Sequence, residues 1–193
     1  SSHMLWVGDR TRYVNSEHLD FVSKLDNPIG IKIGPKIKID DIPAICSKVN
    51  PQNEQGKLIF IVRLGEKNIE KMLPKIIEKV KYYGHEIIWF CDPMHGNTIK
   101  SQNGYKTRQF QTIINELESF FNIHMSSNTI PGGVHIELTG ENVTECLGGI
   151  NDIKDKDLDL RYETACDPRL NNEQSLEIAF LISKLIKQRK NNG

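Results

Sequence analysis

The sequence predicts an α/β fold built on a parallel sheet, and three observations support this. Six short apolar segments recur along the 193 residues. Most of these segments are continuous apolar runs, which are typical of strands buried on both faces. Amphipathic helical patterns lie between them, and strands that alternate with helices indicate βαβ units around a parallel sheet.

Each apolar segment is five or six residues long, which is a usual length for a buried strand. The short runs are too brief for helices of ordinary length. The predicted strands therefore cover residues 4–8, 30–34, 58–63, 87–91, 134–138 and 162–166.

Three longer segments repeat apolar residues at the spacing i, i+3, i+4, i+7, which predicts helices over 69–80, 110–121 and 176–185. Gly84 is expected to end the first of these, since glycine is common just past a helix end. Weaker patterns predict helices over 41–49 and 18–25. The longest irregular stretch, 139–161, is predicted to be a loop with one helical turn.

Two architectures fit this alternation. A closed eightfold barrel of strands and helices typically needs about 250 residues, so six units in 193 residues would leave two strands missing. A six-stranded doubly wound sheet is the competing architecture, but no GxGxxG or Walker sequence marks a nucleotide site. The polar candidates described below follow strands directly, as catalytic residues do in barrels. We expect one domain over residues 1–193.

Composition excludes several classes of function. The 25 basic and 25 acidic residues balance, so overall charge gives no argument for a nucleic-acid or membrane partner. No apolar run approaches the ~20 residues of a membrane span, and residues 1–12 lack the pattern of a signal peptide. The four cysteines have no CxxC spacing, which predicts reduced thiols in a cytoplasmic protein.

Three predicted strand ends carry side chains that bind divalent metals. His95 follows the fourth predicted strand in the turn DPMHGN, Glu137 ends the fifth, and Asp167 follows the sixth. A carboxylate at the end of an apolar strand is costly to bury unless it is paired or bound to a metal. One imidazole and two carboxylates suit Mn²⁺, Co²⁺ or Zn²⁺, so we predict a metal site.

A second set of strand ends supplies only cations, namely Arg10, Lys32 and Arg63. Lys32 lies inside an apolar run, and a buried lysine needs an anionic partner. The same argument applies to Arg63, whereas surface ion pairing explains Arg10 equally well. Because guanidinium groups bind phosphate and carboxylate bidentately, this cluster predicts a small phosphorylated, carboxylated substrate.

Two of the metal candidates also have structural explanations. Glu137 could form an ion pair with a neighbouring lysine or arginine. Asp167 could cap the last helix, although Asn171 or Asn172 could do so instead. Cys166, adjacent to Asp167, is expected to lie near the metal as a thiol rather than to bind it.

Two further segments are left with open roles. His135 lies two residues before Glu137 and points to the same face of a strand. We favour a supporting hydrogen bond over metal ligation for it. The segment KTR at 106–108 could bind a second phosphate at the start of the next helix. A solvated charged turn is the preferred interpretation of this segment.

Several long motifs also carry a family resemblance. They are LWVGDRTR at 5–12, NPIGIKIGP at 27–35, DPMHGNT at 92–98, the run 132–149 and CDPRLN at 166–171. These segments closely resemble class II 3-deoxy-D-arabino-heptulosonate 7-phosphate (DAHP) synthases, and the match spans essentially the whole chain. Because Ser-His-Met or Ala-His-Met precedes Leu-Trp in that family, residues 1–4 look native rather than a vector remnant.

The resemblance implies a TIM (β/α)8 barrel and the first step of the shikimate pathway. In this reaction phosphoenolpyruvate and erythrose 4-phosphate condense with water to give DAHP and phosphate. The resemblance makes His95, Glu137 and Asp167 the metal ligands, with Mn²⁺ or Co²⁺ expected and Zn²⁺ as an alternative. These three residues would thereby take part in catalysis.

The resemblance also implies the phosphoenolpyruvate site. Arg10, Lys32 and Arg63 would hold this substrate together with the backbone around Asp9, and Lys32 would also be catalytic. Asp9 stands where the family commonly has glutamate. That change is conservative if the contact is made by the backbone.

The departure from the family is the absence of its N-terminal half. In the family that half carries the first two barrel strands, a cysteine metal ligand, an arginine for phosphoenolpyruvate and a Lys-Pro-Arg-Ser segment for erythrose 4-phosphate. We therefore expect residues 1–193 to be the C-terminal portion of a homo-oligomeric enzyme, inactive without the missing half.

Two alternatives remain at this point. One is a non-catalytic barrel fragment that needs an N-terminal partner piece. The other is a different metal-dependent phospho-sugar aldolase or hydrolase on a barrel, against which the long motif matches argue.

Overall fold

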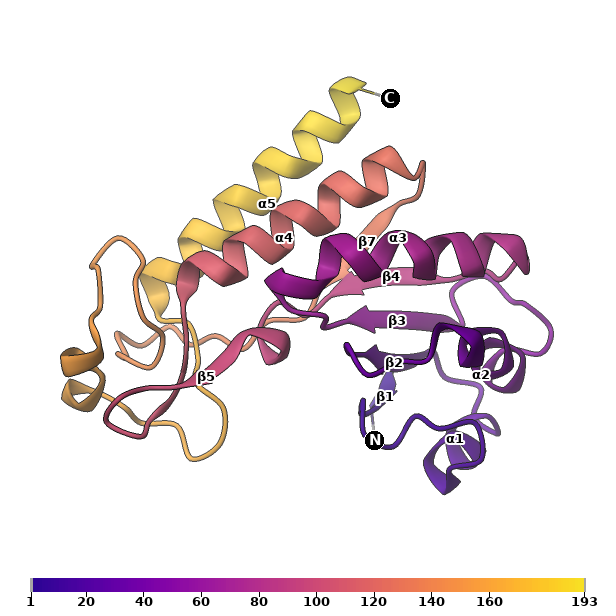
Figure 1. Ribbon diagram of the computed structural model, residues 1–193, viewed down its shortest axis with the longest axis horizontal. Coiled ribbons are helices and arrows are strands. Elements are labelled where there is room, and N and C mark those ends of the chain that lie inside the picture. The colour runs from indigo at the N-terminus through magenta and orange to yellow at the C-terminus, as the bar shows by residue number, and fades with distance from the viewer. Residues whose placement is uncertain (1, 193) are drawn as a thin grey trace.

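A computed structural model describes residues 2–192 and places helices against a five-stranded parallel sheet (Figure 1). The strand order is β1-β2-β3-β4-β7. These strands are β1 (Leu5–Val7), β2 (Ile29–Ile33), β3 (Leu58–Val62), β4 (Ile88–Cys91) and β7 (Pro131–Val134). The helices are α1 (Glu17–Val22), α2 (Ile42–Val49), α3 (Glu66–Tyr82), α4 (Phe110–Ser126) and α5 (Asn172–Asn192).

The sheet is built from the continuous apolar runs. Every residue of β2 and β3 is buried, and the two strands pair in parallel from Ile29 opposite Leu58 to Ile33 opposite Val62. Strand order follows chain order across the described sheet. A doubly wound sheet reverses its order at a switch point, so the competing architecture does not fit these five strands.

Capping residues mark several of the helix ends. Ser16 accepts the backbone N–H of Leu19 at 3.2 Å and starts α1. Gly84 follows α3 with φ of +68°, which confirms the predicted stop. Asn171 accepts the N–H of Gln174 at 2.9 Å, so Asn171 rather than Asp167 caps α5. Figure 1 shows α4 between α3 and α5, with α5 on the side of α4 away from the sheet.

Two predicted strands need correction. The predicted strand 162–166 is wrong, because within the described residues this segment is a loop and the only ladder nearby is an isolated parallel bridge between Leu138 and Leu170. The carboxylate of Glu145 accepts the N–H groups of Glu163 and Thr164 at 3.1 and 2.9 Å, and a strand would need these donors. The predicted strand 134–138 lies earlier, as β7.

The chain between β4 and α4 forms an antiparallel hairpin that the sequence did not predict. Its strands are β5 (Thr98–Lys100) and β6 (Lys106–Arg108), preceded by the short 3-10 helix η2 (His95–Asn97). The stretch 139–161 is irregular as predicted, with one 3-10 helix, η3 (Asp155–Leu160). A further 3-10 turn, η1 (Ile39–Asp41), leads into α2.

Hairpin and loop together form the part of the molecule seen at the lower left of Figure 1. None of the helices in the described residues is long and apolar enough to span a membrane.

Candidate active site

The three predicted metal ligands meet although they come from three separate segments. His95 lies on η2 after β4, Glu137 follows β7, and Asp167 lies in the loop before α5. The Nε2 atom of His95 is 3.2 Å from Glu137 Oε1 and 3.9 Å from Asp167 Oδ2. One donor atom from each residue fits within 4.8 Å of the others. One nitrogen and two carboxylate oxygens at this spacing suit a divalent transition metal.

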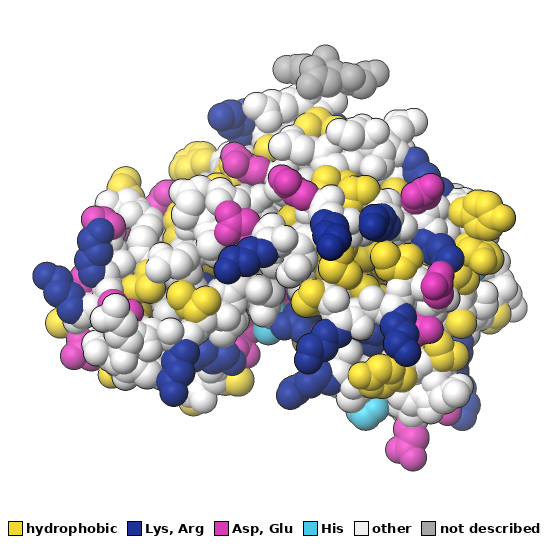
Figure 2. Space-filling view, viewed as in Figure 1, with side chains coloured by type: hydrophobic (Ala, Val, Ile, Leu, Met, Phe, Trp, Pro, Cys, Tyr) yellow, Lys and Arg dark blue, Asp and Glu magenta, His cyan; other side chains and the backbone are white. Residues whose placement is uncertain are grey.

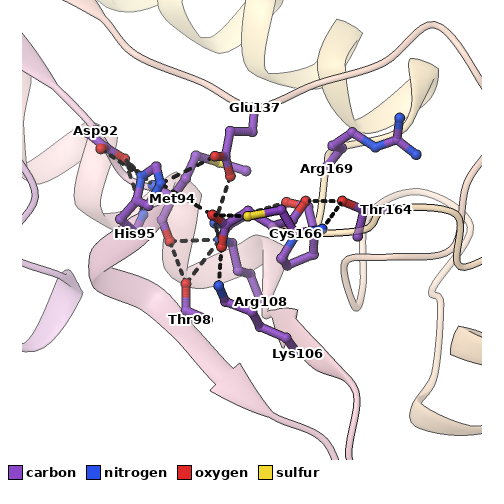
Figure 3. A network of polar contacts seen from close by, with 12 residues as sticks. Asp92, Met94, His95, Thr98, Lys106, Arg108, Glu137, Thr164, Cys166 and Arg169 are labelled. Atoms are coloured by element: carbon purple, nitrogen blue, oxygen red, sulfur yellow. Dashed lines mark hydrogen bonds and ion pairs between the residues drawn. The ribbon is translucent and has the colours of Figure 1, made fainter.

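The orientation of His95 is set by Asp92, a fully buried residue. His95 Nδ1 lies 2.9 and 2.8 Å from the two carboxylate oxygens of Asp92. Since a carboxylate only accepts hydrogen bonds, Nδ1 donates to Asp92, and this fixes Nε2 toward Glu137 (Figure 3). A carboxylate behind a histidine is the usual support of a metal ligand. The hydrogen bonds with Asp92 and Glu137 raise the pKa of His95 to about 9.

Asp92 also holds the turn that presents His95. One of its oxygens accepts the backbone N–H groups of Met94 and His95, both at 3.1 Å. The other contacts the ammonium of Lys32. Burial alone would raise the pKa of Asp92, but the contacts with His95 and Lys32 keep it well below its usual range. Asp92 was not among the predicted site residues, although its place in the DPMH turn is the signal that could have marked it.

Two cations on strand β6 neutralise the two carboxylates of the candidate metal site. Arg108 Nη2 is 2.8 Å from Glu137 Oε2 and 3.8 Å from Asp167 Oδ1, and Lys106 contacts Asp167. Glu137 therefore has the predicted ion-pair partner, while its other oxygen faces His95. The interpretation of 106–108 as a solvated turn is wrong for Arg108, which is fully buried. No apolar periodicity marks this arginine, and its burial could not be predicted from the charged segment KTR.

The predicted cations line one cavity beside the metal candidates. Arg10, Lys32 and Arg63 border a cavity of about 580 Å³ together with His95 and Asp167. Figure 2 shows lysine and arginine side chains gathered around a notch in the surface. Lys32 is only 5% exposed, and burial lowers its pKa while the contact with Asp92 opposes this. The cavity thus offers several positive charges to an anionic ligand.

Arg63 and Asp9 connect the ends of neighbouring strands. Arg63 donates from Nη2 to the carbonyl of His95 at 3.0 Å, and its Nη1 is 3.4 Å from Asp9 Oδ2. The Nε atom of Arg63 is buried without a partner among the described residues. The Asp9 carboxylate accepts the N–H of Gly34 at 2.8 Å and Arg12 Nε at 2.9 Å. Asp9 therefore organises these loops through its side chain.

A buried carboxyl on α4 joins the loops that carry Arg63 and His95. Glu116 accepts the N–H of Gly65 at 2.8 Å and Asn97 Nδ2 at 2.7 Å. The loops touch closely, since a Cβ atom on Gly96 would lie 2.4 Å from the nitrogen of Gly65. Burial raises the pKa of Glu116 to about 8. A glutamate on the apolar stripe of the helix was the available signal for this role.

The loop that carries Asp167 is held by a second buried carboxylate. Glu145 is fully buried and accepts both the N–H of Arg169 at 2.7 Å and its guanidinium at 3.0 and 2.7 Å. Burial acts to raise the pKa of Glu145, but Arg169 lowers it overall. Cys166 is exposed, and its Sγ lies 3.5 Å from Asp167 Oδ2, next to the candidate ligands.

His135 stays outside the converging group of described residues. Its ring centroid lies 6.2 Å from that of His95 and 5.4 Å from that of Trp6, edge to face with the latter. Burial lowers the pKa of His135. These contacts place it beside the metal candidates as a packing neighbour of His95.

Comparison with known proteins shows the family of this chain. Residues 1–183 match the Class-II DAHP synthetase family. The chain is 51% identical over 187 residues to phospho-2-dehydro-3-deoxyheptonate aldolase AroG of Mycolicibacterium smegmatis, covering 97% of this chain and 40% of that protein. It is 48% identical over 185 residues to phospho-2-dehydro-3-deoxyheptonate aldolase of Streptomyces coelicolor, covering 96% of this chain and 41% of that protein. The chain therefore spans about two fifths of these curated relatives, and it belongs to the class-II DAHP synthetase family.

Proposed function

We propose that this chain carries part of a DAHP synthase active site, which condenses phosphoenolpyruvate with erythrose 4-phosphate and water to give DAHP and phosphate. The observation that carries the proposal is the meeting of His95, Glu137 and Asp167 with the cations Arg10, Lys32 and Arg63 at one cavity. A metal site beside a cluster of positive charge matches substrates that bear phosphate, carboxylate and an aldehyde.

We further propose that residues 1–193 are the C-terminal portion of one TIM-barrel domain. The parallel strands follow chain order, as barrel strands do, and within the described sheet β1 pairs only with β2 and β7 only with β4. Both edges are thus free to receive further parallel strands. On α5, Leu176 and Phe180 are exposed, as expected of a helix that lacks a neighbour. The greater length of the curated relatives supports the same proposal.

The residues have distinct roles in this mechanism. Lys32, Arg63 and Arg10, with the backbone around Asp9, neutralise the phosphate and carboxylate of phosphoenolpyruvate and align its C3 atom. This carbon bonds to the aldehyde carbon of erythrose 4-phosphate, water adds at C2, and phosphate leaves. The cations keep the phosphate charge balanced throughout these steps.

His95 Nε2 and the carboxylates of Glu137 and Asp167 would hold Mn²⁺ or Co²⁺, with Zn²⁺ as the alternative. The arrangement fits such an ion because Asp92 keeps the proton on Nδ1 and leaves Nε2 directed at the two carboxylates. A bound ion supplies a Lewis acid for the aldehyde oxygen of erythrose 4-phosphate.

The second candidate function is a non-catalytic barrel fragment that needs a partner piece, which the two open sheet edges favour. Phosphate release from phosphoenolpyruvate, assayed in the presence of erythrose 4-phosphate and Mn²⁺, separates the two functions. It would be measured for this chain alone and with the separately produced N-terminal three fifths of the Mycolicibacterium relative.

Turnover that depends on the added piece and is lost in His95→Gln would support the synthase. The matched control is His18→Gln, since His18 is exposed on α1. A complex that forms without turnover would favour the non-catalytic barrel fragment. Light scattering of the same samples tests the expected homo-oligomer.

A further inference from the structure

Arg108 is the largest fully buried side chain among the described residues. A buried guanidinium must find acceptors for its donors, because an unpaired buried charge is strongly destabilising. Its backbone is also fixed, since the carbonyl of Arg108 accepts the N–H of Leu147 at 2.8 Å. The metal-binding and cationic roles proposed above do not use this residue.

The donors of Arg108 reach all three segments that carry the metal candidates. Its Nε donates to the carbonyl of Met94 at 2.8 Å, one residue before His95. Its Nη2 donates to Glu137 Oε2 at 2.8 Å. Its Nη1 donates to the carbonyl of Pro168, one residue after Asp167. Figure 3 shows Arg108 lying among these groups.

We infer that Arg108 is a positioning residue that sets the geometry of the His95, Glu137 and Asp167 site before any metal binds. This inference rests on the proposed metal centre. Two carboxylates that converge repel one another unless a cation lies between them. The described sheet does not fix these residues, because Glu137 and Asp167 both lie in loops beyond its last strand. A rigid planar fork with donors in several directions can join the three segments.

Charge and geometry act in opposite directions at this position, which makes the inference testable. The positive charge of Arg108 taken alone repels a divalent cation. Its hydrogen bonds keep the ligands together. In Arg108→Lys the charge is kept, but a single ammonium cannot reach the Met94 carbonyl, Glu137 and the Pro168 carbonyl together.

The experiment is a Mn²⁺ titration of the chain and of Arg108→Lys by calorimetry, with folding checked by circular dichroism. We expect affinity to fall about 10–100-fold, the usual cost of losing a residue that orients metal ligands. The matched control is Arg161→Lys. Arg161 pairs with Glu141 and Glu163 at the surface of the segment that also carries Asp167. Arg161→Lys should bind Mn²⁺ as the unmodified chain does.

Hydrogen exchange of the metal-free proteins gives a second readout. Residues 134–138 and 162–170 should exchange faster in Arg108→Lys, while strands β2 and β3 should not change. If Arg108→Lys does not fold, Thr98→Val replaces it, because Thr98 Oγ1 is a second acceptor for Arg108 Nε at 3.3 Å. A fall of several-fold in Mn²⁺ affinity is then expected.

Unchanged or tighter Mn²⁺ binding by Arg108→Lys, or by Thr98→Val in its place, would overturn the inference. If the unmodified chain itself binds no Mn²⁺, the proposed metal centre fails on its own. The exchange of the metal-free proteins then decides the role of Arg108, and identical exchange in the two proteins would overturn it.

Discussion

Two regions of the molecule are ordered by different forces. The regular half, residues 5–91, packs apolar strands against amphipathic helices, and every residue of β2 and β3 is buried. The loop lobe, residues 98–108 and 135–171, has little regular structure and is held by buried charges, above all Arg108 and Glu145. Hydrophobic burial is non-directional, whereas hydrogen bonds to ions fix particular atoms. The first provides a stable frame, and the second places individual ligands.

The largest effect should come from the core of the regular half. Phe60 is fully buried on β3, with its ring 5.7 Å from that of Trp89. Phe60→Ala should lower the free energy of unfolding by about 3–5 kcal/mol, because it removes a large apolar side chain and leaves a cavity. Urea unfolding followed by circular dichroism measures this. Leu160→Ala in the loop lobe is the control, since Leu160 is 74% exposed. Similar losses for the two variants would remove the contrast between the regions.

A smaller and local effect is expected from Glu145→Gln. The change removes the charge that accepts both the backbone and the guanidinium of Arg169, at an expected cost of about 2–3 kcal/mol. Hydrogen exchange should quicken in residues 162–170 and stay unchanged in β3. Glu141→Gln, which breaks an exposed pair with Arg161, is the control. Uniformly faster exchange across both regions would mean that the loop lobe is not a separate unit.

The third effect joins the two regions and depends on pH, so its size grows with the pH interval that is compared. Burial raises the pKa of Glu116 to about 8 from an ordinary value of 4.5. Between these values the folded chain holds a proton that the unfolded chain has lost, so the contribution of Glu116 to stability should fall as pH rises, by about 1.4 kcal/mol per pH unit. Glu116→Gln should lose this slope. The absolute stability of Glu116→Gln is not a clean comparison, because the new amide nitrogen faces the Nδ2 donor of Asn97. The test is therefore the slope of stability against pH, measured by urea unfolding at pH 5–8. An unchanged slope would contradict the assignment to Glu116.

How much could be predicted from the sequence differs between the same two regions. The continuous apolar run at 58–63 predicted β3 to within one residue, and Gly84 marked the end of α3. These signals are local, because apolar periodicity and glycine conformation act within a few residues. The predicted strand 162–166 failed because Glu145, 18 residues from Glu163, takes its backbone donor.

The sequence predicted the three metal candidates of the site but not the residues that hold them in place. His95, Glu137 and Asp167 were expected from their places at predicted strand ends, and the structure brings them together although Glu137 and Asp167 lie in loops. Arg108 and Glu116 were not expected, because their partners are remote in the chain. Arg108 bonds to Pro168 across 60 residues, and Glu116 bonds to Gly65 across 51. Neither residue follows a predicted strand, which is the pattern that linked the three metal candidates at similar separations.

Asp92 has one further consequence. Its single negative charge is shared by Lys32, on the side of the anion cavity, and by His95, on the side of the metal candidates. An anion that draws Lys32 toward itself weakens the contact between Lys32 and Asp92. Asp92 then interacts more strongly with His95, so the anion cavity and the metal candidates share one counterion. Thermodynamic linkage makes such an exchange reciprocal. Inorganic phosphate and Mn²⁺ should therefore change one another's affinity by the same factor, and Asp92→Asn should change the size of that factor.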